Sequence, residues 1–257
     1  MKRYKDHMIF TDAHCHLGSR QFDQDRQLMM DRMMKEKVRK AIMICCSRHD
    51  LSICLELSKL YPDLKLALAI HPQDLEDDHQ EERLERLERI IDEVRPDMIG
   101  ETGLDYYSHP HTKQFQKHFF EAQLKMAQDR DLPVNIHSRQ AAKDTLDTLM
   151  KYKVRGIIHS YSGSVEMADL YLKQGYYLSF GASVLFKGAK KPAEVIRHIP
   201  IERLLIETDA PYQSPIKDHR HEPSDVIRIY EAIAAIKEIA LEDLCDTVEA
   251  NFDNVFR

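Results

Sequence analysis

Two histidines near the amino end of the chain have the spacing of a metal-binding pair. An apolar lead-in, Ile9-Phe10, is followed by the pattern Asp-x-His-x-His over residues 12–16. On a β-strand alternate side chains share a face, so Asp12, His14 and His16 would point the same way. Imidazole suits divalent ions such as Zn, Fe and Cu, so this pair could begin a metal site. The pair alone is equally compatible with two unrelated surface histidines, and the rest of the chain has to decide.

Further metal-capable side chains recur where other short apolar runs end. Each follows or closes a run of β-branched and aliphatic residues: Glu101 after 97–100, His137 at the end of 133–137, His159 at the end of 155–159, and Asp209 just after 203–207. Singly, each residue is ordinary for a protein surface. Their repeated position at strand ends favours a common site.

The elements that must position these residues alternate along the whole chain. Eight strand-like runs are expected at 8–13, 40–45, 65–70, 97–100, 133–137, 155–159, 176–180 and 203–207. Amphipathic stretches separate and follow them, at about 23–38, 50–60, 80–95, 112–130, 140–151, 164–174, 190–198, 224–238 and 241–255. In the stretch 80–95, for example, Leu84, Leu87 and Ile91 recur at helical spacing among charged residues.

This alternation predicts βαβ units and a parallel sheet. Eight such units predict an α/β protein with a closed (β/α)8 TIM barrel, formed by residues 1–257 as one domain. An open doubly wound sheet is the alternative. That fold usually carries a glycine-rich phosphate turn after its first strand, and the sequence has no such turn there.

In a barrel, the carboxyl ends of all strands surround one mouth, where barrel enzymes place their active sites. Four imidazoles and two carboxylates would converge there and could hold two divalent ions, with one carboxylate shared between them. This ligand mixture allows Zn, Mn, Fe or Co, and Mg in a labile position, without distinguishing among them.

Composition restricts the class of protein. The 257 residues are 43% hydrophobic and 31% charged, which is typical of a globular chain. A net charge of −6 provides no basic field for wrapping nucleic acid, although metal ions could still hold phosphates locally. Five cysteines without CxxC spacing favour a reducing, cytoplasmic setting. The charged stretch 1–6 is unlike a secretory signal, and no run reaches the ~18–20 apolar residues of a membrane span.

Several motifs together resemble the TatD-like metal-dependent deoxyribonucleases of the amidohydrolase superfamily. The matching stretches run in the family's order and span nearly the whole chain: Asp12–Leu17, Ile70–Pro72, Gly100–Tyr107, Ile136–Arg139, His159–Ser164 and Glu207–Tyr212. The resemblance implies the barrel fold and a two-metal phosphodiesterase activity. It also implies two ligand sets that share one carboxylate: His14, His16, Glu101 and Asp209 for the first ion, and Glu101, His137 and His159 for the second.

This resemblance leads to a mechanistic expectation. Two ions can polarise a phosphoryl oxygen, activate a water and stabilise the leaving oxygen. Asp209, at a strand end beside the ions, is expected to be the catalytic residue that orients the metal-activated water and accepts its proton. Asp12 and Glu207 have the parity to face the site and are expected to orient ligands rather than bind metal.

Three further residues are candidates for binding substrate. His71 could contact a phosphate or the leaving group, Arg139 could grip a phosphate bidentately, and Lys187 could contact a phosphate. Each has an alternative role. His71 could instead hydrogen bond to a metal-ligating side chain, Arg139 could form a salt bridge at the rim, and Lys187 could simply be solvated. Tyr106 and Tyr107 could stack on a base, although packing is the more usual role of two such aromatics.

The sequence departs from the family pattern in two places. Ser160 and Tyr161 stand where the family has Cys and Phe after the ligand histidine. His221 stands where the family has Asn in an Arg-Asn-Glu-Pro run. The His221 side chain could tune substrate choice or contact a metal.

Three functions remain to be compared. The first is a deoxyribonuclease that acts on DNA ends or single strands, with a 3′–5′ exonuclease as one form of it. The second is an amidohydrolase acting on a small amide, ester or lactone. Many amide-cleaving relatives bridge their metals with a carbamylated lysine, and here no lysine closes a predicted strand, so the shared Glu101 favours the nuclease. The third is a non-catalytic binding protein, against which the intact ligand set argues.

Overall fold

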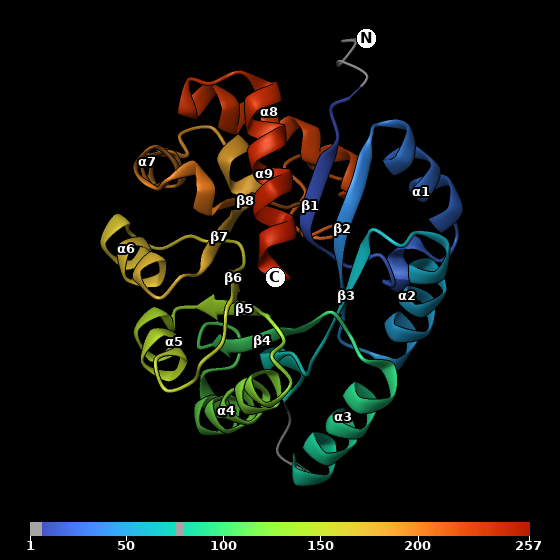
Figure 1. Cartoon of the computed structure of the whole chain (residues 1–257), viewed down its shortest axis with the longest axis vertical. Coiled ribbons are helices and arrows are strands. Elements are labelled where there is room, and N and C mark those ends of the chain that lie inside the picture. Colours follow the sequence, from blue (N-terminus) through green and yellow to red (C-terminus); the bar gives the residue numbers. More distant parts are fainter. Residues whose placement is uncertain (1–6, 76–79) are drawn as a thin grey trace.

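Eight parallel strands form one sheet in chain order, wound into a barrel (Figure 1). The computed structural model describes residues 7–75 and 80–257, so the charged stretch 1–6 lies outside the described residues. The strands are β1 (Phe10–Cys15), β2 (Val38–Cys45), β3 (Leu64–Leu68), β4 (Met98–Asp105), β5 (Val134–Arg139), β6 (Gly156–Ile158), β7 (Tyr177–Phe180) and β8 (Leu204–Ile206). All eight predicted strands are therefore present.

Helices follow the strands and surround them (Figure 1). They are α1 (Arg26–Lys35), α2 (Arg48–Leu60), α3 (Gln80–Val94), α4 (Lys113–Asp129), α5 (Ala142–Leu149), α6 (Val165–Lys173), α7 (Lys190–His198), α8 (Val226–Lys237) and α9 (Leu241–Val255). Short 3-10 turns are η1 (Arg20–Phe22), η2 (Pro72–Asp74), η3 (Pro110–Thr112), η4 (Ala182–Leu185), η5 (Ile201–Arg203) and η6 (Pro223–Asp225). The predicted (β/α)8 barrel is confirmed, with element ends shifted by a few residues.

Local sequence explains why these helices form where they do. Ser47 and Asp50 make a reciprocal capping box at the start of α2, which satisfies backbone N–H groups that have no partner within the helix. In α3, Leu84, Leu87 and Ile91 are buried against the barrel, as their spacing predicts.

The barrel closes where its first and last strands meet. The backbone N–H of Asp209 donates to the carbonyl of His14 at 2.9 Å, and the N–H of His16 donates to the carbonyl of Ala210 at 2.7 Å. These two bonds join the carboxyl end of β1 to the segment after β8. They therefore place Asp209 beside both histidines, although nearly 200 residues separate them in the sequence.

The fourth strand is longer than expected, and this corrects the position of Glu101. The sequence places Glu101 after a strand ending at residue 100, whereas β4 runs on to Asp105. The pairing of β4 with β5 shifts register between Gly100 and Thr102, which makes an irregularity at Glu101 itself. Such bulges redirect a side chain out of the regular alternation and are common beside active sites.

Close approach of β4 to β5 depends on glycine. Gly103 has φ +144°, a region that disfavours side chains, and a Cβ there would lie 2.0 Å from the carbonyl oxygen of His137. The absence of that Cβ brings the two strands, and hence Glu101 and His137, together.

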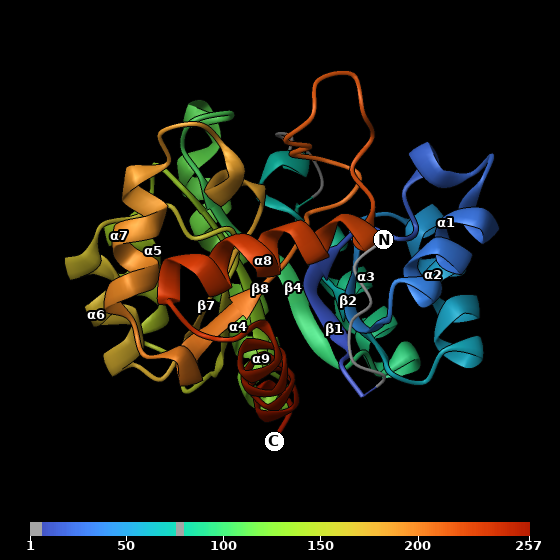
Figure 2. The same ribbon diagram turned by 90° about the horizontal axis from the view of Figure 1, so that it is seen from above.

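The two ends of the barrel are covered differently. At the amino ends, the Asn251 side chain of α9 donates to the carbonyls of Ile201 and Leu204, each at 2.8 Å. Figure 2 shows the loop between β8 and α8 projecting from the side of the molecule opposite α9. Among the described residues, no helix combines the length and apolar character that crossing a membrane requires.

Candidate metal centre

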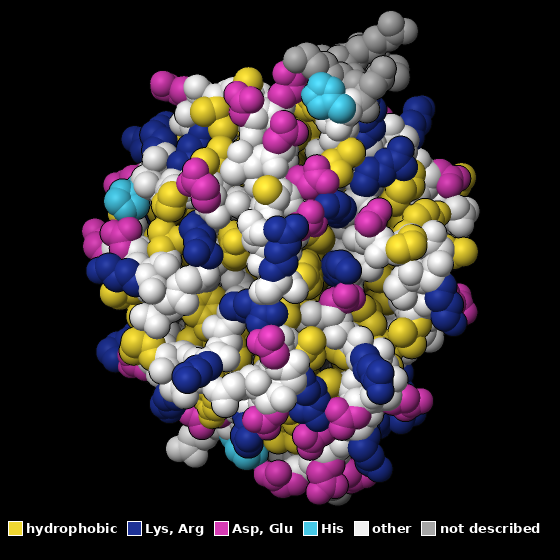
Figure 3. All heavy atoms as spheres, viewed as in Figure 1, with side chains coloured by type: hydrophobic (Ala, Val, Ile, Leu, Met, Phe, Trp, Pro, Cys, Tyr) yellow, Lys and Arg dark blue, Asp and Glu magenta, His cyan; other side chains and the backbone are white. Residues whose placement is uncertain are grey.

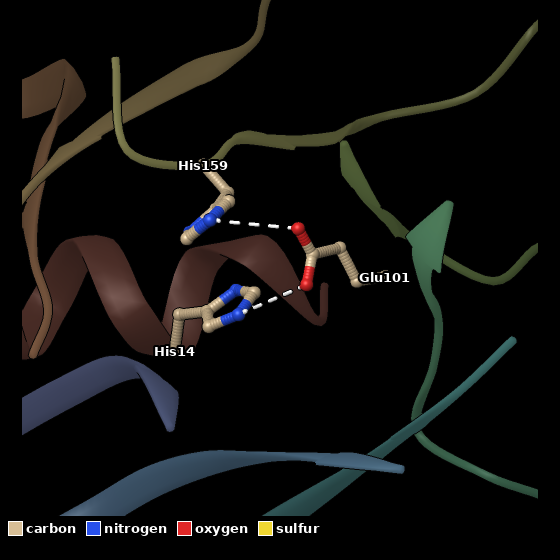
Figure 4. Close-up of side chains that lie close together, drawn as sticks. All are labelled: His14, Glu101 and His159. Carbon is tan, nitrogen blue, oxygen red and sulfur yellow. Dashed lines mark ion pairs between the residues drawn. The ribbon is translucent and has the colours of Figure 1, made fainter. Parts of the chain in front are cut away.

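Six predicted ligands converge inside the mouth of the barrel, with the Glu101 carboxylate among them. Its Oε2 lies 3.3 Å from His14 Nε2, and its Oε1 lies 3.5 Å from His159 Nε2. Figure 4 shows the carboxylate of Glu101 reaching one oxygen toward each imidazole. Glu101 is almost completely buried, so its charge is shielded from bulk water.

One group of ligand atoms gathers at the seam between β1 and β8. His14 Nε2 lies 3.3 Å from His16 Nε2 and 3.5 Å from Asp209 Oδ1, and His16 Nε2 lies 3.3 Å from the same carboxylate oxygen. Ligand atoms around one tetrahedral zinc-sized ion lie roughly 3.3–3.6 Å apart. The spacing of this group therefore fits a single divalent ion.

A second group gathers on the other oxygen of Glu101. Its Oε1 lies 2.7 Å from His137 Nδ1 and 3.4 Å from His71 Nε2, in addition to the contact with His159. His71 thus stands beside the predicted second ligand set, where the sequence predicts only a substrate contact. The arrangement offers imidazole nitrogens and one shared carboxylate, which is a donor set for borderline-soft divalent ions.

The electrostatics of the cluster also fit bound cations. In the described part of the chain, the charged partners of Glu101 and Asp209 within 4 Å are all imidazoles, and none is Lys or Arg. Burial raises the pKa of Glu101, but nearby imidazoles, foremost His71, hold it well below its usual range. Burial likewise raises the pKa of Asp209, but its hydrogen bond to His16 and other imidazoles lower it to about 2. Both carboxylates are therefore ionised near neutrality and available as ligands.

Each deeply placed imidazole has a second contact that sets its orientation. His14 Nδ1 lies 3.0 Å from Asn135 Oδ1, and His159 Nδ1 lies 2.9 Å from Glu207 Oε1. With these nitrogens occupied, the Nε2 atoms face Glu101. A ligating imidazole commonly uses its other nitrogen in this way, which fixes the tautomer. The expectation that Glu207 orients a ligand agrees with its position.

Asp12 acts on the backbone next to the site. Its carboxylate accepts hydrogen bonds from the N–H and hydroxyl of Thr208 and from the N–H of His14. It thereby ties β1 to the segment after β8 and supports two ligand positions without reaching the cluster of nitrogens, as expected.

Asp105 is a functional residue that sequence reasoning missed. It is fully buried, its Oδ2 lies 3.2 Å from His137 Nε2, and its Oδ1 accepts from the N–H groups of Tyr107 and Ser108. A usable signal existed, since Asp105 lies four residues after Glu101 and shares its strand face. Asn135 could have been found in the same way, because it lies two residues before His137 and shares its strand face.

Asp105→Asn is expected to weaken binding of the ion beside His137 by about 10–100-fold, with little effect on the ion at the β1–β8 seam. If the asparagine side chain at this position kept the two hydrogen bonds from the backbone N–H groups of Tyr107 and Ser108, its N–H₂ group would face His137 Nε2. In wild type a carboxylate oxygen, which is an acceptor, occupies that position. Metal titration of the metal-free protein by calorimetry measures this, with Asp129→Asn, at an exposed residue of helix α4, as the control. Two unchanged affinities would show that Asp105 does not position His137.

The cluster opens into a cavity of about 640 Å³. Five of the six predicted ligands line it, namely His16, Glu101, His137, His159 and Asp209, whereas His14 is fully buried behind them. Around them the lining includes Cys46, Asp50, His71, Gln73, Asp74, Ser138, Arg139, Ser160, Ser162, Ser183, Tyr212 and Gln213. Among the lining residues that the structure describes, Arg139 is the one Arg or Lys. Of the predicted substrate contacts, His71 and Arg139 thus reach the cavity. Lys187 lies exposed in the loop after η4 and is not among the lining residues.

His221 has a different position from the one that its motif suggests. The side chain is fully buried, and its Nδ1 lies 3.0 Å from the carbonyl oxygen of Tyr212. It belongs neither to the cavity lining nor to the metal-capable groups of the described residues. The contact instead links the two ends of the β8–α8 loop and so supports Tyr212 at the cavity wall.

The barrel and this cluster of donors define a metal-dependent hydrolase. A family model described as TatD related DNase matches residues 11–257, and the chain belongs to the TatD family. It is 37% identical over 256 residues to the uncharacterized metal-dependent hydrolase YabD of Bacillus subtilis (strain 168), covering 97% of this chain and 99% of that one. It is 30% identical over 267 residues to the uncharacterized metal-dependent hydrolase YcfH of Escherichia coli (strain K12), covering 97% and 96% of the two chains.

A solved structure agrees with these sequence relatives. The TatD homologue YjjV from Escherichia coli K12 superposes with a TM-score of 0.86 at 26% identity, covering 94% of this chain and 95% of that one. The resemblance noted from the motifs is thereby confirmed at the level of family and fold.

Proposed function

We propose that this protein is a divalent-metal-dependent phosphodiester hydrolase, specifically a deoxyribonuclease that acts on DNA ends or single strands. A 3′–5′ exonuclease is the form that we expect. The observation that carries the proposal is the shared Glu101 carboxylate, which lies between two groups of imidazoles at an open cavity. Two adjacent ion positions suit a reaction in which an attacking and a leaving oxygen both need stabilisation.

The residues divide the work of such a reaction among them. One ion would be held by His14, His16, Glu101 and Asp209, and the other by Glu101, His137 and His159. When bound, these ions supply Lewis-acid polarisation of the phosphoryl group and activation of a water molecule.

Asp209 is the residue that we expect to orient the attacking water and accept its proton. Its Oδ1 faces the histidines at the seam, while its Oδ2 accepts from the Gln213 side chain at 2.6 Å. Because its pKa is lowered to about 2, the carboxylate is ionised near neutrality and can accept a hydrogen bond from an attacking water, which orients that water for transfer of its proton. Arg139 in the cavity lining offers paired N–H donors to a non-bridging phosphate oxygen.

The charge distribution favours the end of a strand over a long duplex. The chain carries a net charge of −6 and so has no overall excess of positive charge for a long duplex. On the face that bears α9, which lies at the opposite end of the barrel from the cavity, positive and negative side chains are interspersed (Figure 3). A broad basic groove is what binding along duplex DNA would use. A substrate held by its phosphate at a metal-lined cavity needs only local positive charge.

The test uses protein stripped of metal with EDTA and then given Mg²⁺, Mn²⁺, Zn²⁺ or Co²⁺ singly. We expect cleavage of an end-labelled single-stranded oligonucleotide with at least one of these ions, with the label pattern showing the direction. Parallel assays contain small amides, esters and lactones. Hydrolysis of one of these together with intact DNA under every ion would replace the nuclease proposal with the amidohydrolase alternative.

A further inference from the structure

Exposed aromatic rings occur in several of the loops that follow strands of the barrel. Among the described residues, the large exposed aromatics are Tyr107, Phe115, Phe186 and Tyr212. Three of these four follow strands at their carboxyl ends: Tyr107 follows β4, Phe186 lies after β7 and η4, and Tyr212 lies after β8. Because an exposed aromatic ring can stack on a nucleobase, each of these rings is a candidate base contact wherever it lies within reach of the cavity.

The two tyrosines after β4 differ sharply in environment. Tyr106 is partly buried, its hydroxyl donates to Asp144 Oδ2 at 2.7 Å, and the Lys113 ammonium lies 4.5 Å from its ring centroid. Its polar and aromatic groups are therefore engaged within the protein. Tyr107 is 57% exposed, and its ring is available at the surface.

Arg139 holds the Tyr107 ring at the edge of the cavity. Arg139, the last residue of β5, pairs with Asp105, the last residue of β4. Arg139 therefore lies beside the start of the loop between β4 and α4. The guanidinium carbon lies 4.1 Å from the Tyr107 ring centroid, a cation–π contact. In the described part of the chain Arg139 forms no ion pair with a carboxylate, and it lines the cavity. Its N–H donors thus stay available to an anion next to the ring.

We propose that Tyr107 and Arg139 form a platform for the end of a single DNA strand, with an unpaired base stacked on Tyr107 while Arg139 binds the adjoining phosphate. The inference rests on the proposed nuclease function and specifies its substrate form. Stacking on an aromatic side chain accepts any base but requires that base to be unstacked from its neighbours. A base-paired end cannot offer its face in this way without melting.

Two further exposed rings, Tyr212 and Phe186, lie in other loops after strands. Tyr212 lines the cavity and meets His16 edge-on at 5.2 Å between centroids, so it lies directly beside the candidate metal cluster. Phe186 lies in the loop after β7. Together with Tyr107 they lie in loops that follow three different strands, and of the three rings Tyr212 is the one that lines the cavity.

The test compares Tyr107→Leu with Tyr107→Phe on two single-stranded oligonucleotides. One carries normal bases throughout, and the other carries abasic residues over the last three positions at both ends. Tyr107→Leu is expected to lower kcat/KM on the normal oligonucleotide by about 10–100-fold. On the abasic oligonucleotide, wild type and Tyr107→Leu are expected to agree within about twofold, because no base remains to stack. Tyr107→Phe keeps the ring and should match wild type.

Two additional measurements make the result specific. Tyr152→Leu, which changes a partly buried tyrosine between α5 and β6, away from the cavity, is the control for the loss of a tyrosine ring and should leave both rates unchanged. In an Asp209→Asn background, where turnover is removed, terminal 2-aminopurine fluorescence should be quenched on binding, and Tyr107→Leu should abolish the quenching.

The possible failures are distinguishable. If wild type cleaves the normal oligonucleotide and Tyr107→Leu keeps the same preference for normal over abasic ends, the platform is wrong while the nuclease function stands. If wild type cleaves neither oligonucleotide with any of the four ions, the proposed function fails, and the platform fails with it.

Discussion

Glu101→Gln is expected to abolish binding of both ions and to lower DNA cleavage by about 10³-fold or more. The side chain contributes one oxygen to each group of imidazoles, at 3.3 Å from His14 and 2.7 Å from His137. An amide lacks the negative charge, and it turns an N–H₂ group toward one of the two ion positions. A loss at this residue should therefore affect both ions, whereas loss of an outer ligand should affect one.

Metal content and thermal stability measure the Glu101→Gln result independently of activity. A ligand at 100 times its Kd stabilises the folded state by about 2.7 kcal/mol, so metal should raise the Tm of wild type but not of the variant. Glu88→Gln is the control. Glu88 is an exposed residue of helix α3 whose carboxylate pairs with Arg130, and its variant should behave as wild type. Normal metal content in Glu101→Gln would show that Glu101 is not the shared ligand.

Asp209→Asn is expected to lower kcat by about 10³-fold with little change in the KM for the oligonucleotide. The variant keeps an oxygen near His14 and His16 but can no longer accept a proton. Asp209 has φ +62°, a left-handed conformation that Asn also tolerates, so the backbone should remain intact. The carboxylate has its pKa lowered to about 2, so in wild type the loss of activity from its protonation appears only in strong acid.

Single-turnover kinetics and circular dichroism distinguish loss of chemistry from loss of fold in Asp209→Asn. Asp218→Asn is a matched control, because Asp218 is an exposed residue of the same loop that also has a positive φ, +59°. A near-normal kcat for Asp209→Asn would assign the proton transfer to another group.

The fold was predictable because short apolar runs and longer amphipathic stretches alternate regularly along the sequence. Apolar runs such as 40–45 and amphipathic stretches such as 80–95 alternate without long interruptions, and all expected strands and helices are present. The site was largely predictable for the same reason. Once eight parallel strands are assigned, the residues at their carboxyl ends must lie at one mouth.

What the sequence left open depends on side-chain direction and on contacts between strands. The extension of β4 past Glu101 arises from glycine-dependent packing on β5, which local propensity does not report. Asp105 and Asn135 share strand faces with predicted ligands, but only the pairing of β4 with β5 and the inward direction of β1 show which imidazole each contacts. The separation of Tyr106 from Tyr107 likewise depends on Asp144, from a different helix.

The measurement that tests the two-ion account most directly is a titration of metal-free protein with Mn²⁺ while cleavage of an end-labelled single-stranded oligonucleotide is followed. The donors on either side of the Glu101 carboxylate, with His14 near one oxygen and His137 and His159 near the other, predict no cleavage in EDTA and a rate that reaches its plateau at two equivalents of ion per chain. Cleavage that persists in EDTA, or a plateau at one equivalent, would contradict the account.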